Sequence, residues 1–239
     1  AADNLPNSRV LQDGLPVRKR IFAGSRVGAF NRFGLVPDRF TLLIMGGSQG
    51  ASGLNTMAAQ ALSDLPPERA EQLQVLHLTG PSKQDDTAGA DMPPGLIYRP
   101  HGYLSGIEDA YAAADLVLCR AGGSSLAEVT ALGLPSVLVP YPEAADDHQR
   151  ANARSLVRAG GAIMVDEQNS GPQELRAVIC RALCRPETFE RMGQCAGLVG
   201  KPRAARAAVR HICRLAGRTE PMSSGSETSE DNNALSSAA

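Results

Sequence analysis

The sequence predicts an α/β fold, a doubly wound parallel sheet of the Rossmann-like kind with helices on both faces. Two observations predict it. Short apolar runs alternate along the chain with stretches of helical periodicity, and continuous apolar runs are typical of strands buried on both faces of a parallel sheet. Two glycine pairs, in residues 46–50 and 122–123, each join such a run to a helical stretch, as in the strand–turn–helix units of doubly wound folds.

Apolar runs of strand length mark the expected strands of the sheet. They are residues 40–47, 73–80, 96–101, the second half of 109–120, 135–142 and 162–167. Helical patterns lie between them, at residues 51–63, the first half of 109–120, 125–134 and 146–160. Gly160 and Gly161 give the last of these a clear C-terminal signal. Three further helical stretches between 172 and 216 are expected to close the domain.

The chain divides into three parts by composition. Residues 1–38 carry scattered proline and glycine and the basic cluster Arg18-Lys19-Arg20, and we expect a linker with one short strand. Residues 39–217 form the α/β domain. Residues 218–239 are rich in serine and nearly devoid of core-forming side chains, which predicts a disordered tail.

Bulk composition excludes several classes of function. The net charge of −1 gives no indication of a general affinity for nucleic acid or anionic lipid. No apolar run reaches the roughly 18 residues of a membrane span, and no secretory signal is evident. The five cysteines form no CxxC pair and no Cys/His cluster, so we expect reduced thiols and no zinc.

The first glycine turn, Gly46 to Gly50, is a candidate phosphate-binding turn. Backbone N–H groups at a helix N-terminus favour an anion, glycine lets a ligand approach the backbone, and Ser48 adds a hydroxyl donor. The alternative is a tight turn that binds nothing. The common nucleotide fingerprints are absent, because the spacing is not GxGxxG, the next strand ends HLTGPSK without an acidic residue, and no lysine follows the glycines.

The second glycine turn, in CRAGGSSLAEV (119–129), leaves two interpretations of Glu128 open. Ser125-x-x-Glu128 has the spacing of a capping box, in which Glu128 returns to the backbone at the start of its helix. Alternatively, both glycine turns face one crevice. One turn would then hold a diphosphate, and Glu128 would accept hydrogen bonds from the two hydroxyls of a ribose.

A third polar cluster lies in PYPEAADDHQRANA (140–153). Asp146 or Asp147 is expected to cap the helix that follows. A metal site with His148 is not expected, since adjacent side chains on a helix point apart. Gln149 and Asn152 are three positions apart on one helix face, and their amides suit sugar hydroxyls. No cofactor is expected.

Five motifs, in order along the chain, resemble the MurG family of cytoplasmic N-acetylglucosaminyltransferases, which convert lipid I to lipid II in bacterial peptidoglycan synthesis. They are GLPVR (14–18), GGSQGASGLN (46–55), HLTG (77–80), ADLVLCRAGGSSLAE (114–128) and GLPSVLVPYPEAADDHQRANA (133–153). The resemblance covers residues 14–216. It implies one half of a GT-B glycosyltransferase, namely the C-terminal UDP-sugar-binding domain with the interdomain linker. In the family, the N-terminal domain supplies the membrane-associating surface, the acceptor site and the general base.

The resemblance also implies roles for individual residues. Arg18 matches an arginine that contacts the nucleotide sugar, although Leu15 replaces the usual asparagine of that motif. Ser48, with Gln49 beside it, matches the serine that meets the phosphates. Leu104 falls where backbone groups are presented to uracil. The donor-binding loop is Gly123, Ser124, Ser125, Leu126, Ala127 and Glu128.

Within that loop Glu128 would hold the ribose, and outside it Gln149 would contact the N-acetylglucosamine. Glu143 stands where many members have histidine and receives no role. The implied reaction is an inverting displacement of UDP from UDP-N-acetylglucosamine by a hydroxyl of lipid I (undecaprenyl-diphospho-MurNAc-pentapeptide), without a metal. The implied location is the cytoplasmic face of the inner membrane, with no nucleic-acid partner.

Two alternatives to a fused enzyme remain open from the sequence. One is a donor-binding subunit of a split UDP-sugar transferase, and the other is a UDP-sugar-binding module without chemistry.

Overall fold

The structure is a computed structural model that describes residues 13–47, 50–81, 83–87, 91–169 and 171–218. The chain divides into a large unit that ends at Ala205 and a small one that begins at Arg206. All of the expected tail except Arg218 lies outside the described residues, so its predicted disorder stays a prediction.

The large unit is built on one six-stranded sheet in which every neighbouring pair is parallel. The strands are β1 (Phe40–Met45), β2 (Leu73–Leu78), β3 (Ile97–His101), β4 (Leu116–Cys119), β5 (Ser136–Leu138) and β6 (Ala162–Met164). Their spatial order is β3-β2-β1-β4-β5-β6, the order of dinucleotide-binding doubly wound folds. The predicted fold class is therefore confirmed.

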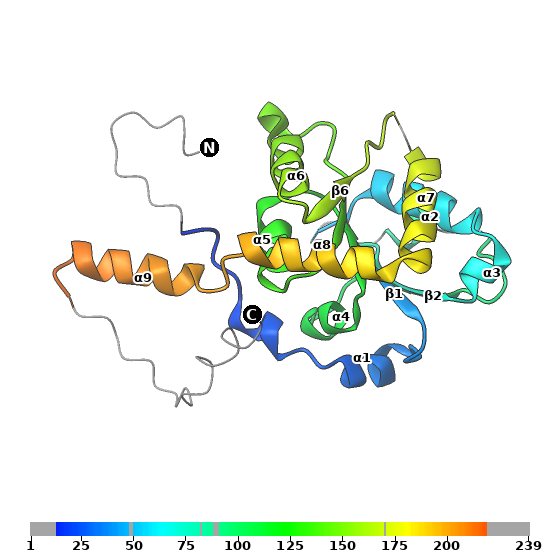
Figure 1. Ribbon diagram of the computed structural model, residues 1–239, viewed down its shortest axis with the longest axis horizontal. Helices are drawn as coiled ribbons and strands as arrows, with labels where there is room; N and C mark the ends of the chain where they lie inside the picture. The colour runs from blue at the N-terminus through cyan, green and yellow to red at the C-terminus, as the bar shows by residue number, and fades with distance from the viewer. Residues whose placement is uncertain (1–12, 48–49, 82, 88–90, 170, 219–239) are drawn as a thin grey trace, which may run out of the picture. The chain divides into compact units, whose positions relative to one another are not determined.

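Nine α-helices and three short 3-10 helices accompany the sheet in the described part of the chain (Figure 1). The α-helices are α1 (Arg26–Phe33), α2 (Ser52–Ser63), α3 (Pro67–Ala70), α4 (Glu108–Ala113), α5 (Gly123–Ala131), α6 (His148–Arg158), α7 (Gly171–Cys184), α8 (Pro186–Val199) and α9 (Ala204–Leu215). The 3-10 helices are η2 (Lys19–Ala23), η3 (Gln84–Thr87) and η4 (Ala145–Asp147). Within these residues no helix has the length and apolarity that crossing a membrane requires.

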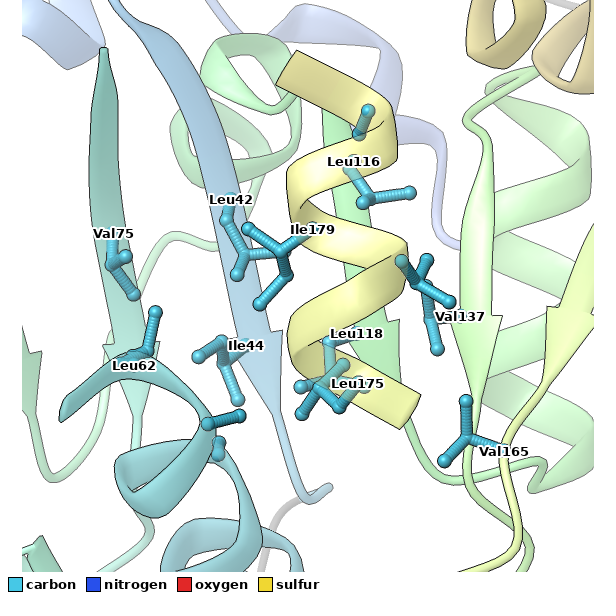
Figure 2. Close-up of a cluster of buried hydrophobic side chains, with 14 of the residues drawn as sticks. Leu42, Ile44, Leu62, Val75, Leu116, Leu118, Val137, Val165, Leu175 and Ile179 are labelled. Carbon is cyan, nitrogen blue, oxygen red and sulfur yellow. The ribbon is translucent and has the colours of Figure 1, made fainter. Parts of the chain in front are cut away.

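Alternate residues of each strand enter two separate cores, as the pleat of a strand requires. In β1, Leu42 and Ile44 belong to the core under α2 and α7, whereas Leu43 and Met45 belong to the core under α1, α4, α5 and α6. Figure 2 shows the first core, with Leu175 and Ile179 of α7 lying over the central strands. Burial on both faces explains the continuous apolar runs in the sequence.

The segment before β1 differs from its expected structure. Among its described residues, 13–38, the chain forms η2 and α1 rather than a short strand. Ser25 accepts a hydrogen bond from the backbone N–H of Gly28, which caps α1, and Gly34 ends the helix in the left-handed conformation. Ala29 and Phe33, four positions apart, are buried where α1 packs against α4 (Figure 1). That this segment links two domains stays a prediction.

Strand and helix limits also shift at two other positions. β5 covers only three residues of the predicted 135–142, because Pro140 and Pro142 lack the N–H that a central strand needs. α5 begins at Gly123, two residues earlier than predicted, and this changes the interpretation of Glu128.

The sheet brings the two glycine turns together. After β1 the chain builds β2 and β3 on one side, and it then returns to place β4 on the other side of β1. Met45 and Cys119, at the carboxyl ends of β1 and β4, are paired in register. The turns that follow them therefore lie side by side at the switch point of the sheet, where doubly wound folds bind ligands.

Candidate functional site

Two cavities lie along the glycine turns and share Gly47 and Ser125 as lining residues, so they are adjoining parts of one crevice. The first cavity has a volume of about 540 Å³ and is lined by Pro16, Arg18, Arg20, Met45, Gly47, Leu78, Gly80, Gly102, Tyr103, Leu104, Ile107, Ser124, Ser125 and Glu128. The second has a volume of about 650 Å³ and is lined by Gly46, Gly47, Gly50, Ala51, Ser52, Gly53, Lys83, Arg120, Gly122, Ser125, Tyr141, Pro142, Glu143, Gln149, Glu167 and Gln168.

Glycine is required at the first turn for two reasons. Gly47 and Gly50 have φ angles of +91° and +69°, which residues with a side chain rarely adopt. A Cβ at Gly50 would also collide with the carbonyl oxygen of Thr79, whereas a Cβ at Gly47 would meet open space. The turn thus presents bare backbone to the crevice. Ser48 and Gln49 lie outside the described residues, and their roles stay predictions.

The second turn opens the N-terminus of α5 towards both cavities. Gly122 precedes the helix without any side-chain cap, and the backbone N–H of Leu126 makes the first bond back to the Gly122 carbonyl. The N–H groups of Gly123, Ser124 and Ser125 have no partner within the helix, as in the first turn of any helix. Ser124 and Ser125 line the first cavity. This arrangement favours an anionic group between the turns.

Glu128 does not form the capping box. Ser125 lies inside α5 rather than before it, and the Glu128 carboxylate bonds to side chains of distant segments. Its Oε1 accepts hydrogen bonds from Arg18 Nε at 3.2 Å and Nη2 at 2.9 Å, and its Oε2 accepts one from the Tyr111 hydroxyl at 2.9 Å. The Glu128 side chain is 13% exposed and lines the first cavity, so the structure supports the crevice interpretation.

Arg18 lines the same cavity with a half-exposed side chain. Its hydrogen bond with Glu128 raises the pKa of the guanidinium, so the group carries a positive charge at any pH at which the protein is folded. Leu104, in the segment between β3 and α4, forms an apolar wall of the cavity with Tyr103 and Ile107. Positive charge, carboxylate and apolar wall therefore line one pocket.

Gln149, near the start of α6, lines the second cavity. Its Oε1 accepts a hydrogen bond from the backbone N–H of Tyr141 at 3.0 Å, which leaves the amide N–H groups to donate to a ligand. Asn152 does not join it. The Asn152 amide donates to the Ala121 carbonyl at 3.1 Å and, with Leu126 and Ala127, lines a separate cavity of about 320 Å³. The expectation that Asn152 shares a sugar site with Gln149 is therefore wrong, because that amide supports the turn after β4.

Arg120 and Glu167 belong to the second cavity and were not singled out in the sequence. Arg120 directly follows β4 and is 7% exposed. It donates to Glu167 Oε2 at 2.5 Å and to the carbonyls of Val139 and Pro140 at 3.3 Å, while its buried Nε has no hydrogen-bond partner among the described residues. Gly53 makes room for this pair, since a Cβ there would collide with the Glu167 carboxylate. The position of Arg120, a charged residue between an apolar strand and a glycine pair, was the sequence feature that could have identified it as a site residue.

His77 is a structural residue of the sheet. It is fully buried in β2, where Nδ1 lies 2.7 Å from the Tyr98 hydroxyl and Nε2 lies 3.0 Å from Asn55 Oδ1. Burial lowers the pKa of His77 to about 4, so the ring is neutral. The Asn55 amide in turn donates to the Thr79 carbonyl at 2.8 Å. This network fixes α2 against the strand that carries Gly80.

The aspartates before α6 also differ from their expected role. Asp146 and Asp147 have left-handed backbone conformations, with φ angles of 52° and 49°, and the Asp147 side chain makes no cap bond. It accepts instead from Arg150 at 3.3 Å. Arg150 also bonds Asp166 at 2.8 Å, which lowers the pKa of that carboxyl to about 2. In the part of the chain that the structure describes, no three histidine, cysteine or acidic side chains gather as a metal site would require.

Comparison with protein families identifies the domain that this crevice belongs to. Residues 41–208 match the glycosyltransferase family 28 C-terminal domain. Two relatives carry the name UDP-N-acetylglucosamine--N-acetylmuramyl-(pentapeptide) pyrophosphoryl-undecaprenol N-acetylglucosamine transferase. The one from Anaeromyxobacter sp. (strain Fw109-5) is 39% identical over 206 residues, 86% of this chain and 52% of the relative. The one from Desulforudis audaxviator (strain MP104C) is 36% identical over 230 residues, 91% of this chain and 60% of the relative.

Solved structures agree with these relatives. The crystal structure of MurG from Acinetobacter baumannii matches with a TM-score of 0.66 and 28% identity, over 81% of this chain and 55% of that chain. WaaG, a glycosyltransferase involved in lipopolysaccharide biosynthesis, matches in fold with a TM-score of 0.61 and 19% identity, over 83% of this chain and 55% of that chain. The predicted resemblance to the MurG family is confirmed, and the chain spans about half the length of the curated relatives it matches.

Proposed function

Because the chain belongs to the glycosyltransferase family 28 C-terminal domain family, we propose that it is the donor-binding half of a GT-B N-acetylglucosaminyltransferase. Its donor is UDP-N-acetylglucosamine and its acceptor is lipid I, so that the product is lipid II of peptidoglycan. The observation that supports this function best is the single crevice in which two glycine turns, a helix N-terminus and the Arg18–Glu128 pair meet.

Each part of the donor has a matching part of the crevice. The uracil ring lies against Leu104 in the first cavity, and the ribose hydroxyls donate to Glu128. The diphosphate lies between the glycine turns, where backbone N–H groups of α5 and the Arg18 guanidinium face it. The N-acetylglucosamine occupies the second cavity beside Gln149. The first cavity's mixture of apolar wall and polar groups suits a nucleoside.

The chemistry is an inverting displacement at C1 of the sugar. As the acceptor hydroxyl attacks, the bond between C1 and the diphosphate oxygen breaks, and negative charge grows on the departing UDP. The helix N-terminus and Arg18 stabilise that charge, which is the main catalytic contribution of this half. No protein group has to form a covalent bond to the sugar.

The general base and the acceptor groove belong to a second, complementary half. The histidines of the large unit's described residues, His77, His101 and His148, line neither cavity. His77 is buried in the sheet, and His148 Nδ1 lies 2.6 Å from the Ala145 carbonyl oxygen. We assign the base, the lipid I site and peripheral attachment to the cytoplasmic face of the inner membrane to that complementary half.

Two other functions use the same crevice. A subunit of a split transferase would bind the donor equally well and act only with a separate acceptor chain. A UDP-sugar-binding module would bind the donor and support no transfer with any partner. The relatives' printed names favour a transferase over a binding module without chemistry.

Calorimetry with the purified chain tests the donor assignment. UDP and UDP-N-acetylglucosamine should bind more tightly than ADP or NAD, because the base pocket beside Leu104 is matched to uracil and a purine is larger. ADP serves as the matched control, since it carries the same ribose and diphosphate. Equal affinities for ADP and UDP would overturn the uracil assignment, and no binding of either would overturn the donor site as a whole.

A further inference from the structure

Tyr111 is a buried tyrosine whose hydroxyl has one specific partner. The side chain, in α4, is 1% exposed and packs in the core below the central strands. Its hydroxyl donates to Glu128 Oε2 at 2.9 Å. A phenylalanine would fill the same core space, so packing alone does not account for the hydroxyl. Buried tyrosine hydroxyls generally have a partner, and this one is a carboxylate at the wall of the first cavity.

The three donors around Glu128 define the direction of the carboxylate. Arg18 gives Oε1 two hydrogen bonds, and Tyr111 gives Oε2 one. An ionised carboxylate has about four acceptor positions. The position that remains is therefore on Oε2, the same oxygen that Tyr111 holds. Because both oxygens are held, the carboxylate plane cannot rotate freely.

The two supports of Glu128 differ in rigidity. Arg18 is 53% exposed and comes from the segment before η2, so it can exchange partners with an anionic ligand at low cost. Tyr111 is enclosed by the core and cannot leave. Only the tyrosine therefore keeps the carboxylate in place when Arg18 turns to a diphosphate.

We propose that Tyr111 is a positioning residue, which holds Glu128 so that its free acceptor positions, one on Oε2 and those on Oε1 that Arg18 vacates for the diphosphate, meet a vicinal diol in the first cavity. The inference rests on the proposed function, because the diol is the ribose of the UDP donor. Preorganisation of this kind strengthens binding by removing the cost of ordering the acceptor on association. Tyr111 touches Glu128 and does not line the cavity itself.

The protonation state of Tyr111 suits this role. Burial, followed by the charge of Glu128, raises the pKa of the phenol far above its ordinary value. The hydroxyl is consequently a donor at every pH at which the protein is folded.

The test compares two nucleotides and two tyrosine variants by calorimetry on the 239-residue chain. The probes are UDP and 2′,3′-dideoxyuridine 5′-diphosphate, which differ only in the diol. The wild type should prefer UDP by about tenfold or more, the size expected for hydrogen bonds to a charged acceptor. Tyr111→Phe should reduce this preference by about fivefold and leave the affinity for the dideoxy nucleotide unchanged. Tyr98→Phe, which removes a partly buried hydroxyl bonded to His77, is the matched control and should keep the full preference.

The outcomes separate the two proposals. A wild type that binds both nucleotides equally would overturn the ribose assignment and this inference with it. A wild type that prefers UDP, together with a folded Tyr111→Phe chain of the same preference, would overturn the inference alone.

A second measurement needs no variant at Tyr111. In the wild-type chain labelled with carbon-13 at the tyrosine Cζ, both nucleotides carry the diphosphate that draws Arg18 from Glu128, so UDP should shift the Tyr111 resonance further than the dideoxy nucleotide does. A Tyr111 resonance that responds equally to both nucleotides would contradict the proposed link between the hydroxyl and the diol.

Discussion

The Arg18 guanidinium lies 2.9 Å from the Glu128 carboxylate, although the two residues are 110 positions apart in the chain. The pair joins the segment before η2 to the helix after β4 across one wall of the first cavity. The sequence assigned the two side chains to different parts of a donor. Their contact means that the positive charge proposed for the diphosphate and the acceptor proposed for the ribose are parts of one unit.

Replacing Glu128 by alanine should weaken UDP binding by about 1–3 kcal/mol, the usual cost of losing hydrogen bonds to a charged group. The free energy of unfolding should fall by about 1–3 kcal/mol, because the hydroxyl of the buried Tyr111 loses its acceptor, while the lost ion pair with Arg18 is partly exposed and adds little. Calorimetry and urea unfolding measure the two quantities. Glu190→Ala, on the surface of α8, is the control. A destabilised Glu128→Ala chain with normal UDP affinity would contradict the ribose assignment.

Gly122→Ala should weaken UDP binding without destabilising the fold. Gly122 has an ordinary backbone conformation, with φ −69° and ψ 145°, and a Cβ there meets no atom within 4 Å. The stability change should stay within about 0.5 kcal/mol. Gly122 lines the second cavity at the turn proposed to hold the diphosphate, so the added methyl group should overfill that site and cost about 1–3 kcal/mol of binding free energy.

Gly50→Ala is the matched contrast in the other turn. Its φ of +69° and the nearby Thr79 carbonyl make any side chain strained, so unfolding free energy should fall by about 2 kcal/mol or more. Thermal melting and UDP calorimetry of both variants give the comparison. Equal loss of stability in the two variants would show that Gly122 is needed for folding rather than for space.

Acid should destabilise the protein through His77. The folded-state pKa of about 4 lies below the ordinary value of 6.5, so the unfolded chain takes up the proton first as pH falls. The contribution of neutral His77 to the free energy of unfolding is complete above about pH 6.5 and is lost as the pH falls towards 4. At pH 5 about 2 kcal/mol of it has been lost. Urea unfolding at several pH values measures the slope of the free energy of unfolding against pH. His77→Gln should flatten it, whereas His148→Gln at an exposed site should not. An unchanged slope in His77→Gln would disprove the assignment.

The chain alone should transfer no measurable sugar to lipid I. Holding donor, acceptor and base together supplies a rate factor of about 10⁵ or more, and a donor-binding half alone cannot supply it. Radiolabelled UDP-N-acetylglucosamine with lipid I gives the assay, and a full-length relative gives the positive control. Adding a complementary acceptor half, fused or in trans, should restore transfer. Robust transfer by the chain alone would mean that the base and acceptor groove lie within its own residues.

The sheet and its glycine turns were predictable because local pattern determines them. β1 is an apolar run that ends at a glycine pair, and the same pattern recurs at β4. Side-chain contacts between segments far apart in the chain were not predictable from such patterns. The contacts of Glu128 with Arg18 and Tyr111 depend on how α4, α5 and the first segment pack, and nothing local in the sequence specifies them.

Two expectations failed for similar reasons. Gln149 and Asn152 share a helix face by spacing, yet the helix is placed so that only Gln149 reaches the crevice. The first segment contains enough glycine and proline to look irregular, while Ala29 and Phe33 give it a buried face only when α4 is present. In both cases tertiary packing decided the outcome.

The parallel pairing of β1 with β4 has a consequence for folding of the chain during its synthesis on the ribosome. Leu42 and Leu116 lie opposite each other in the finished sheet, so β1 emerges long before its second neighbour has been translated. Until then one edge of this apolar central strand is open, and an open apolar edge promotes pairing with other chains. A nascent chain stalled between β3 and β4 would therefore expose the future floor of the crevice, and it is at this stage that chaperones have the most to protect.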